Sequence, residues 1–251
     1  MIAFFSLQKD SLMYPLTNKG ERIRDMFDAI APRYDFLNRL LSFGIDKKWR
    51  RFAVRQIRFA EGGKILDVAT GTADVALEIA AATPSSVTIS GVDFSQQMID
   101  LGRVKVETSP FAERISLHVA PCEAIPFGDN SFDSATIAFG IRNVVDRHCG
   151  LKEILRTLKP GGRIVILEFS NPRSKTFKAL YNFYFLRILP VIGGFFSTFS
   201  AYKYLPDSVL EFPPQEEFKI LMTESGFENI AHHDLTFGIA TVYTGEKKFS
   251  M

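Results

Sequence analysis

The stretch that decides the fold is DVATGTAD at residues 67–74, a tight turn of small residues with a carboxylate at each end. An apolar run at residues 64–69 leads into it, and residues 75–80 then place apolar side chains at helical spacing. Strand, turn and helix in this order are typical of an open α/β sheet, where ligands bind beyond the carboxyl ends of the strands. We expect the helix to begin near Thr72 or Asp74, with these side chains capping exposed backbone amides.

Short apolar runs farther along the chain predict the rest of the sheet. Those rich in Val, Ile and Phe are typical of buried parallel strands, and they occupy residues 87–93, 115–120, 132–139 and 163–169. A helix precedes the last run and should end at residues 159–162, because proline and glycine stop helices. A helix at 215–224 and strands at 228–235 and 238–245 predict a terminal hairpin. The predicted fold class is α/β: a doubly wound, seven-stranded, mostly parallel sheet with a C-terminal antiparallel hairpin.

Two regions lie outside the predicted sheet. We expect an N-terminal tail at residues 1–20, a helical lid at 21–60, and a main domain at 61–251 that carries an aromatic helical insertion at 171–212. The insertion places an apolar stripe at helical spacing and further aromatics after it: Phe177, Leu180, Tyr181, Tyr184, Phe185, Ile188, Leu189 and Ile192, then Phe195, Phe196, Phe199, Tyr202 and Tyr204. A helix packed on the core and a shallow membrane contact both fit this pattern.

Composition excludes several classes of function. The chain has 251 residues and a net charge of +2 with its basic residues spread out, which favours no nucleic-acid partner. Two cysteines and no signal peptide indicate a reducing, intracellular setting. No run approaches the roughly 20 apolar residues of a membrane-spanning helix. The four histidines show no ligand spacing with cysteines or carboxylates, so we expect no metal site.

The turn and the strand ends indicate a nucleoside cofactor. Gly71 lets the backbone approach a ligand, Thr72 offers a donor, and Asp67 holds a charge at the end of its strand. Asp93 ends the second strand, from which a carboxylate can accept two hydrogen bonds from a ribose diol. The G-x-G-x-x-G spacing that seats a pyrophosphate is missing. S-adenosylmethionine therefore suits the turn better than a nicotinamide dinucleotide, which remains the alternative.

The loop after the third strand is the expected adenine site. Pro121 and Cys122 begin a loop that can lay backbone amides and an apolar wall along an adenine, although an ordinary surface loop is the alternative. A Pro-Cys pair also supplies the nucleophile of cytosine C5-methyltransferases, but there it follows the fourth strand. We therefore expect Cys122 to be a small buried thiol.

At this point the chain resembles a known family. Residues 67–74, Asp93-Phe94-Ser95, Ile125-Pro126-Phe127 and residues 158–163 are similar to the successive motifs of class I S-adenosylmethionine-dependent methyltransferases. Three further segments resemble the C-methyltransferases that complete menaquinone and ubiquinone: Tyr34-Asp35-Phe36-Leu37-Asn38 with Ser42 and Trp49, residues 139–144, and Leu167-Glu168-Phe169-Ser170. The resemblance extends over residues 20–247.

The resemblance implies a reaction and an acceptor. The acceptor would be a ring carbon of a reduced, polyprenylated demethylquinol, made electron-rich as a neighbouring hydroxyl loses its proton. Arg142 would stabilise the phenolate charge and Asn143 or a bound water would orient the hydroxyl, unless Arg142 only pairs with Asp146 or Glu168. Tyr34 and Asp35 belong to the lid and could close over the substrate, although Tyr34 could equally serve packing alone.

Demethylmenaquinol is the favoured acceptor, since the menaquinone reaction is the more widespread in bacteria. The ubiquinone-precursor methoxybenzoquinol, another phenolic or lipid acceptor, and a silent lipid-binding subunit remain alternatives. We expect a cytoplasmic protein, in possible contact with the inner face of the membrane. The oligomeric state stays open.

The sequence departs from the family pattern at several positions. Asp46 stands where the family often has histidine, alanines stand at 69 and 73 where glycine is common, and Pro121 replaces an asparagine or aspartate. An alanine is tolerated in such a turn if its φ stays negative. We therefore expect negative φ at Ala69 and Ala73, and adenine recognition by backbone groups around Cys122.

Overall fold

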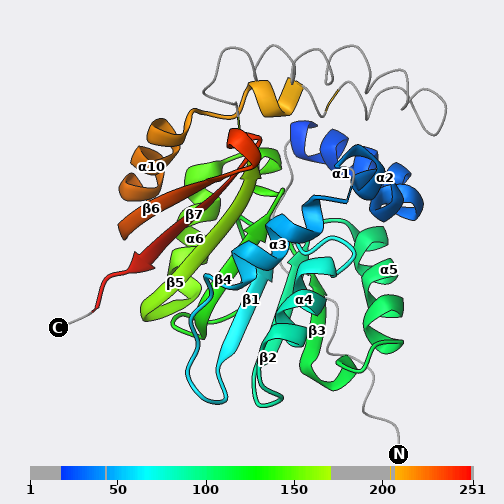
Figure 1. The fold of residues 1–251 in the computed structure, drawn as a ribbon, viewed down its shortest axis with the longest axis horizontal. Coiled ribbons are helices and arrows are strands. Elements are labelled where there is room, and N and C mark those ends of the chain that lie inside the picture. The colour runs from blue at the N-terminus through cyan, green and yellow to red at the C-terminus, as the bar shows by residue number, and fades with distance from the viewer. Residues whose placement is uncertain (1–17, 43, 171–203, 205–206, 250–251) are drawn as a thin grey trace, which may run out of the picture.

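The computed structural model describes residues 18–42, 44–170, 204 and 207–249, and it centres on one seven-stranded sheet of order β3-β2-β1-β4-β5-β7-β6 (Figure 1). The strands are β1 (Lys64–Val68), β2 (Thr88–Asp93), β3 (Ile115–Val119), β4 (Phe132–Ala138), β5 (Leu158–Phe169), β6 (Phe227–Leu235) and β7 (Ala240–Lys247). Strands β1 to β5 pair in parallel, whereas β7 is antiparallel to both β5 and β6. The predicted sheet and its C-terminal hairpin are confirmed. The expected tail up to residue 17 and most of the aromatic insertion lie outside the described residues.

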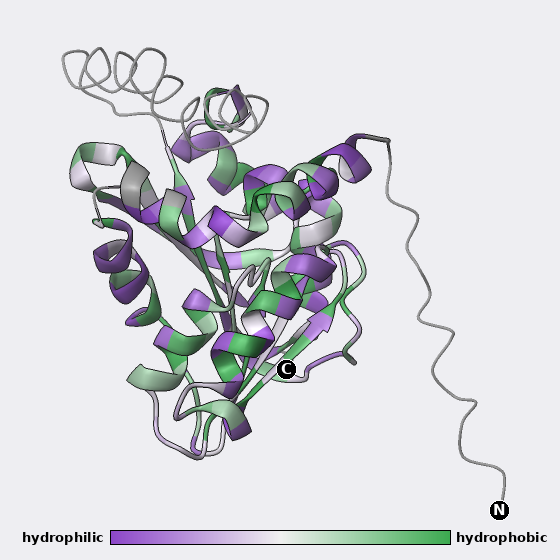
Figure 2. Cartoon of the chain, turned by 90° about the vertical axis from the view of Figure 1, so that its right-hand side faces the viewer, coloured by the Kyte–Doolittle hydropathy of each residue, from purple (hydrophilic) through white to green (hydrophobic). Residues whose placement is uncertain are grey.

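Helices cover both faces of the sheet. They are α1 (Asn18–Ile30), α2 (Tyr34–Leu41), α3 (Asp46–Val54), α4 (Asp74–Ala82), α5 (Gln96–Glu107), α6 (Arg147–Thr157) and α10 (Gln215–Glu224), with short 3-10 turns η1 (Ala31–Arg33), η2 (Ala112–Arg114), η3 (Ile141–Asn143) and η5 (Thr236–Gly238). Because side chains alternate along a strand, Ile164 and Ile166 pack with α6 and α10, while Val165 and Leu167 pack with α3 and α4. Hydrophobic residues accordingly gather toward the sheet and hydrophilic ones on the outer sides of the helices (Figure 2).

Strand β5 begins earlier than predicted. The sequence placed a helix stop at residues 159–162, but α6 ends at Thr157 and β5 starts at Leu158. Phe132 pairs with Leu158 before the register shifts, and the Leu158 carbonyl accepts a hydrogen bond from Lys247 Nζ at 2.8 Å. These contacts with neighbouring strands hold the Pro-Gly-Gly segment in the sheet.

The start of α4 matches the prediction, but its capping does not. The helix begins at Asp74 after Ala73, and no side chain caps it. The Thr72 hydroxyl instead donates to Asp35 Oδ1 of the lid at 2.6 Å. The expected negative φ values are also wrong, since φ is +51° at Ala69 and +67° at Ala73. The turn therefore holds two alanines in the left-handed region, at a cost of about 1–2 kcal/mol each.

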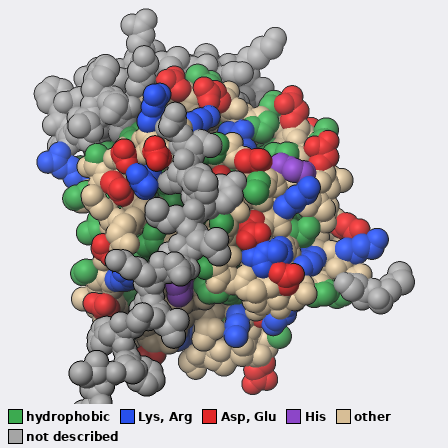
Figure 3. Space-filling model, turned by 180° about the vertical axis from the view of Figure 1, so that it is seen from behind, with side chains coloured by type: hydrophobic (Ala, Val, Ile, Leu, Met, Phe, Trp, Pro, Cys, Tyr) green, Lys and Arg blue, Asp and Glu red, His purple; other side chains and the backbone are tan. Residues whose placement is uncertain are grey.

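Opposite charges are mixed on the molecular surface. On the face seen in Figure 3, Lys and Arg side chains alternate with Asp and Glu rather than forming a patch of one sign. Across the part of the chain that the structure describes, no helix is long and apolar enough to cross a bilayer.

Candidate active site

A pocket opens at the point where the strand order reverses. Strands β2 and β3 lie on one side of β1 and strands β4 and β5 on the other, which makes the ends of β1 and β4 the expected ligand site. The pocket holds about 700 Å³ of empty space, a volume that includes its open mouth. Its wall combines the turn after β1, the loops after β2, β3 and β4, and Phe27 and Tyr34 of the lid.

Asp93 and Gly71 form one end of this pocket. Asp93 Oδ2 accepts a hydrogen bond from Gly71 N and Oδ1 accepts one from Ser95 N, both at 2.9 Å. Burial raises the pKa of Asp93 to about 6, and the nearby Asp28 carboxylate acts in the same direction. Each carboxylate oxygen retains a lone pair, so an ionised Asp93 can accept two further hydrogen bonds from a diol.

Asp67 and Thr72, by contrast, do not line the pocket. The buried Asp67 carboxylate accepts hydrogen bonds from the hydroxyls of Thr70 and Thr136, each at 2.6 Å, and burial raises its pKa to about 6. Asp67 therefore stabilises the turn after β1 by linking it to β4. Thr72 donates to the Asp35 carboxylate of the lid and so holds the turn from outside the pocket.

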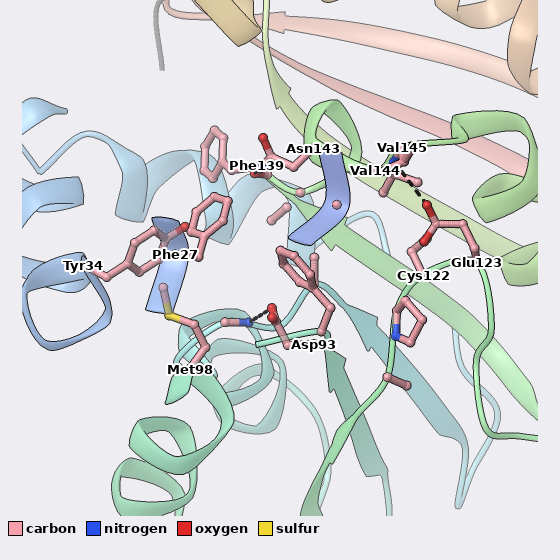
Figure 4. Close-up of a pocket in the computed structure, with 18 residues that line it drawn as sticks. Phe27, Tyr34, Asp93, Met98, Cys122, Glu123, Phe139, Asn143, Val144 and Val145 are labelled. Carbon is pink, nitrogen blue, oxygen red and sulfur yellow. Dashed lines mark hydrogen bonds between the residues drawn. The ribbon is translucent and has the colours of Figure 1, made fainter. Parts of the chain in front are cut away.

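The loop after β3 forms the opposite wall, where Pro121 and Cys122 both line the pocket. Burial raises the pKa of the Cys122 thiol well above its usual range, which agrees with the predicted inert thiol. Glu123 Oε1 accepts a hydrogen bond from Val145 N at 3.1 Å and so ties this wall to the loop beyond β4 (Figure 4).

Aromatic side chains form a further wall of the pocket. Phe27 and Tyr34 come from the lid and Phe139 follows β4, with the Phe27 and Tyr34 ring centroids 6.1 Å apart. Figure 4 shows Phe27 and Tyr34 on the side of the pocket opposite Cys122, and Asn143 beside Phe139. Burial raises the pKa of Tyr34, so its hydroxyl is neutral near pH 7. These three rings make flat apolar walls that carry few polar groups.

Arg142 and Asn143 follow β4 on η3 but face different surroundings. Asn143 lines the pocket, as predicted, whereas Arg142 does not. Arg142 Nη1 lies 2.7 Å from Glu168 Oε1, with the two side chains only 6% and 0% exposed, and it also donates to the Phe139 carbonyl at 2.6 Å. Of the two pairings considered from the sequence, the structure has the one with Glu168. Asp146 instead caps α6, accepting from Cys149 N at 2.9 Å.

Carboxylates hold the lid on the cofactor end of the pocket. Asp28 of α1 accepts a hydrogen bond from Ser95 Oγ at 2.5 Å, directly beside Asp93. Asp35 of α2 accepts from both Thr72 Oγ1 and Lys105 Nζ, the latter at 2.8 Å. These contacts join the lid to the turn after β1 and to the first turn and the third turn of α5.

A second set of charges fixes α3, the last helix of the lid. Arg50 of α3 pairs with Asp46 at 2.6 Å and with Asp74 at 3.1 Å, and Lys105 also pairs with Asp74. Asp46, which departs from the family pattern, thus accepts hydrogen bonds from Arg50 and from Ser42 Oγ. Sequence reasoning missed Lys105 and Arg50, because both pair with Asp74 of α4, which is far from them in the sequence.

Sequence reasoning also missed part of the pocket wall. Phe27, Phe94, Met98 and Glu123 line it in addition to the predicted residues. Glu123 directly follows the predicted adenine loop and could have been found there. Phe27 and Met98 carry no signal beyond an apolar helical position.

The pocket suits a ligand that has a ribose and an adenine. At Gly71, where φ is +55°, a Cβ would come within 3.8 Å of the Tyr34 ring, so the missing side chain leaves space between the turn and Tyr34. Gly71, Asp93, Pro121 and Cys122 converge on this space, and it continues without a break to Phe139 and Asn143. S-adenosylmethionine, which carries a ribose and an adenine, fits these lining residues.

Comparisons with known proteins agree with this geometry. The model of the ubiE/COQ5 methyltransferase family matches residues 16–247. The chain is 74% identical over 235 residues to the ubiquinone/menaquinone biosynthesis C-methyltransferase UbiE of Geotalea uraniireducens, covering 94% of this chain and 100% of that protein. It is 44% identical to the demethylmenaquinone methyltransferase of Deinococcus radiodurans, covering 92% of this chain and 95% of that protein.

Solved structures show the same fold at low identity. The [4+2]-cyclase SpnF aligns with a TM-score of 0.70 at 15% identity, covering 94% of this chain and 98% of the other. Phosphoethanolamine N-methyltransferase 2 of Haemonchus contortus, in complex with S-adenosyl-L-methionine, aligns with a TM-score of 0.64 at 16% identity, covering 90% and 60% of the two chains.

Proposed function

The chain belongs to the ubiE/COQ5 methyltransferase family and is an S-adenosylmethionine-dependent C-methyltransferase of quinone biosynthesis, and we propose that its acceptor is demethylmenaquinol. The observation that carries the proposal is that one pocket is lined both by a carboxylate that could bind a diol and by flat aromatic walls and an amide. The product of the transfer would be menaquinol.

We propose that Asp93 accepts the two ribose hydroxyls of the cofactor and that Gly71 gives its chain room. Pro121 and Cys122 would contact the adenine through backbone groups and an apolar surface. Thr72 would act from behind, by holding the turn against Asp35. When bound, S-adenosylmethionine supplies an electrophilic methyl group that needs a correctly placed nucleophile more than it needs activation.

At the acceptor end, Tyr34 and Phe139 would hold a flat ring in line with that methyl group. In favourable cases such positioning can lower the activation barrier by roughly 7–11 kcal/mol. Asn143 would contact the hydroxyl whose deprotonation makes the ring electron-rich. Arg142 would add positive potential from behind the wall, an effect that its buried partner Glu168 partly cancels.

A naphthoquinol and a benzoquinol both remain acceptors that a flat pocket could hold. The relatives' names favour both, since one names ubiquinone with menaquinone and the other demethylmenaquinone alone. The methoxybenzoquinol precursor of ubiquinone is therefore the second candidate.

We further propose that the enzyme acts at the cytoplasmic face of the membrane through a peripheral contact, because a polyprenyl chain partitions into the bilayer. The aromatic insertion of residues 171–212 supports this proposal by its composition alone. Flotation with vesicles that contain a long-chain quinone tests it. Protein that stays entirely in the soluble fraction would count against it.

Competition between acceptors tests the proposed substrate. Radiolabelled S-adenosylmethionine is offered with equal amounts of chemically reduced demethylmenaquinone and methoxybenzoquinone, and oxidised quinones serve as controls. We expect label in the naphthoquinol fraction and none with either oxidised quinone. Preferential labelling of the benzoquinol would shift the assignment to the ubiquinone precursor.

A further inference from the structure

Tyr204 makes a polar contact with the acceptor end of the pocket that the proposed chemistry does not yet use. The sequence grouped Tyr204 with the aromatics of the insertion, as part of a surface for a lipid tail. In the structure it is half-buried, and its hydroxyl donates to Asn143 Oδ1 at 3.0 Å. Tyr204 does not line the pocket itself, so it reaches the substrate only through Asn143.

Two hydrogen bonds hold the Asn143 amide, one at each end. Asn143 Nδ2 donates to the Phe139 carbonyl at 3.4 Å, on the other side of the amide from Tyr204. Exchanging the amide oxygen and nitrogen would set two acceptors against each other at Phe139, so the Phe139 carbonyl fixes the orientation of the amide. In that orientation Oδ1 faces Tyr204, whose hydroxyl is then the donor. An NH₂ group has two hydrogens, and only one is used by Phe139. The second N–H is free to serve a ligand in the pocket.

We propose that Tyr204 is a positioning residue that holds the Asn143 amide in place with one N–H available to the acceptor's oxygen. This inference rests on the proposed function. Asn143 is then a hydrogen-bond donor to the developing phenolate, rather than a group that accepts its proton. Donation from Tyr204 to the amide oxygen also polarises the amide, which strengthens the N–H on its far side.

The surroundings of Tyr204 keep its hydroxyl protonated, so that it can donate a hydrogen bond. Burial is the main cause that raises the pKa of its hydroxyl, although the positive charge of Arg142 opposes this shift. The hydroxyl is thus protonated throughout the neutral range. Arg142 does not line the pocket, and its Nη1 already donates to Glu168 and to the Phe139 carbonyl.

A double-mutant cycle tests the proposal with the full chain. Wild type, Tyr204→Phe, Asn143→Ala and the double variant are compared by kcat and KM for reduced demethylmenaquinone, and by the Kd for S-adenosylmethionine. Tyr204→Phe should lower kcat about three- to tenfold, the usual worth of one hydrogen bond, with the cofactor Kd unchanged. In the Asn143→Ala background the same substitution should change kcat by less than about twofold, since its target is gone.

Two controls separate positioning from general structure. Tyr243→Phe removes a hydroxyl from a fully buried tyrosine of β7, whose ring packs against Phe218, and it should leave kcat unchanged. Asn143→Asp replaces the N–H donor by a carboxylate, and it should lower kcat at least as much as Asn143→Ala does. Equal losses from Tyr204→Phe in both backgrounds, or no loss in either, would overturn the proposal.

The same cycle is repeated without turnover, by calorimetric binding of 1,4-naphthohydroquinone in the presence of S-adenosylhomocysteine. Tyr204→Phe should weaken binding only when Asn143 is present, and uncoupled binding effects would again overturn the proposal. If the wild-type enzyme binds this ring yet methylates no quinol, the proposed function fails while the coupling between Tyr204 and Asn143 is still measured.

Discussion

The Arg142→Ala substitution separates stability from chemistry at this site. Arg142 and Glu168 lie 2.7 Å apart with side chains 6% and 0% exposed, so their charges are almost fully removed from water. Among the described residues, removing the arginine leaves the carboxylate with the backbone N–H groups of Phe169 and of residue 142 as donors, at 2.8 and 3.2 Å.

Breaking a buried pair from one side costs about 3–5 kcal/mol, a large part of the roughly 5–15 kcal/mol that stabilises a typical domain. For a chain of this size, 1 kcal/mol shifts Tm by about 2–4 °C, so we expect Tm to fall by about 6–20 °C. Calorimetric melting of the variant against wild type measures this shift. The Kd for S-adenosylmethionine, measured well below Tm, should not change because Arg142 is not part of the pocket wall.

The matched control removes both charges. The double variant Arg142→Met with Glu168→Gln should recover most of the lost Tm, because no unpaired charge stays buried. An unchanged Tm in Arg142→Ala, or a double variant no more stable than the single one, would refute this reasoning. If the recovered double variant also retains its kcat, the proposed contribution of Arg142 to phenolate stabilisation is wrong.

Three further predictions concern the cofactor end of the pocket. The pKa of Asp93 is about 6 and the ribose requires the ionised carboxylate, so the cofactor Kd should be constant above pH 7 and rise by up to about tenfold per pH unit below pH 6. Titration calorimetry measures this, and a pH dependence that survives in the weaker-binding variant Asp93→Asn would exclude Asp93 as its source. In the folded chain a Cβ at Gly140 would lie 2.4 Å from the Ala69 Cβ, so Gly140→Ala should lower the free energy of unfolding in urea by about 1–3 kcal/mol. Adding Ala69→Gly should restore most of this stability, and no restoration would contradict the clash. Asp35→Ala should raise the dissociation rate of the cofactor several-fold in stopped-flow experiments, because it releases the lid from Thr72 and Lys105. The effect should be smaller in high salt, which already screens the Asp35–Lys105 pair, and an unchanged rate would mean that these contacts do not hold the lid.

The fold was predictable because buried strands and turn residues leave local signals. The apolar runs located every strand within a few residues, and residues 67–74 located the ligand site. The φ values of Ala69 and Ala73 were not predictable in this way, since alanine carries no left-handed preference and the turn geometry is imposed by the strands around it.

The orientation of polar side chains in the site depended on partners far away in the sequence. Thr72 turns toward Asp35 on a helix 37 residues earlier, and Arg142 turns toward Glu168, 26 residues later on a neighbouring strand. Such pairings follow from the packing of the lid and the register of β4 with β5, which no local pattern encodes. The sequence could therefore name the residues of the site but could not tell those that line the pocket from those that brace it.

Identification of the methylated atom tests the central claim most directly. The purified protein is given S-adenosylmethionine with a carbon-13 methyl group and chemically reduced demethylmenaquinone, and the product is examined by NMR. We predict a new methyl group on a ring carbon of the naphthoquinol, and none when the quinone is left oxidised. A labelled methyl on oxygen, or cofactor binding with no transfer to the reduced ring, would contradict the account.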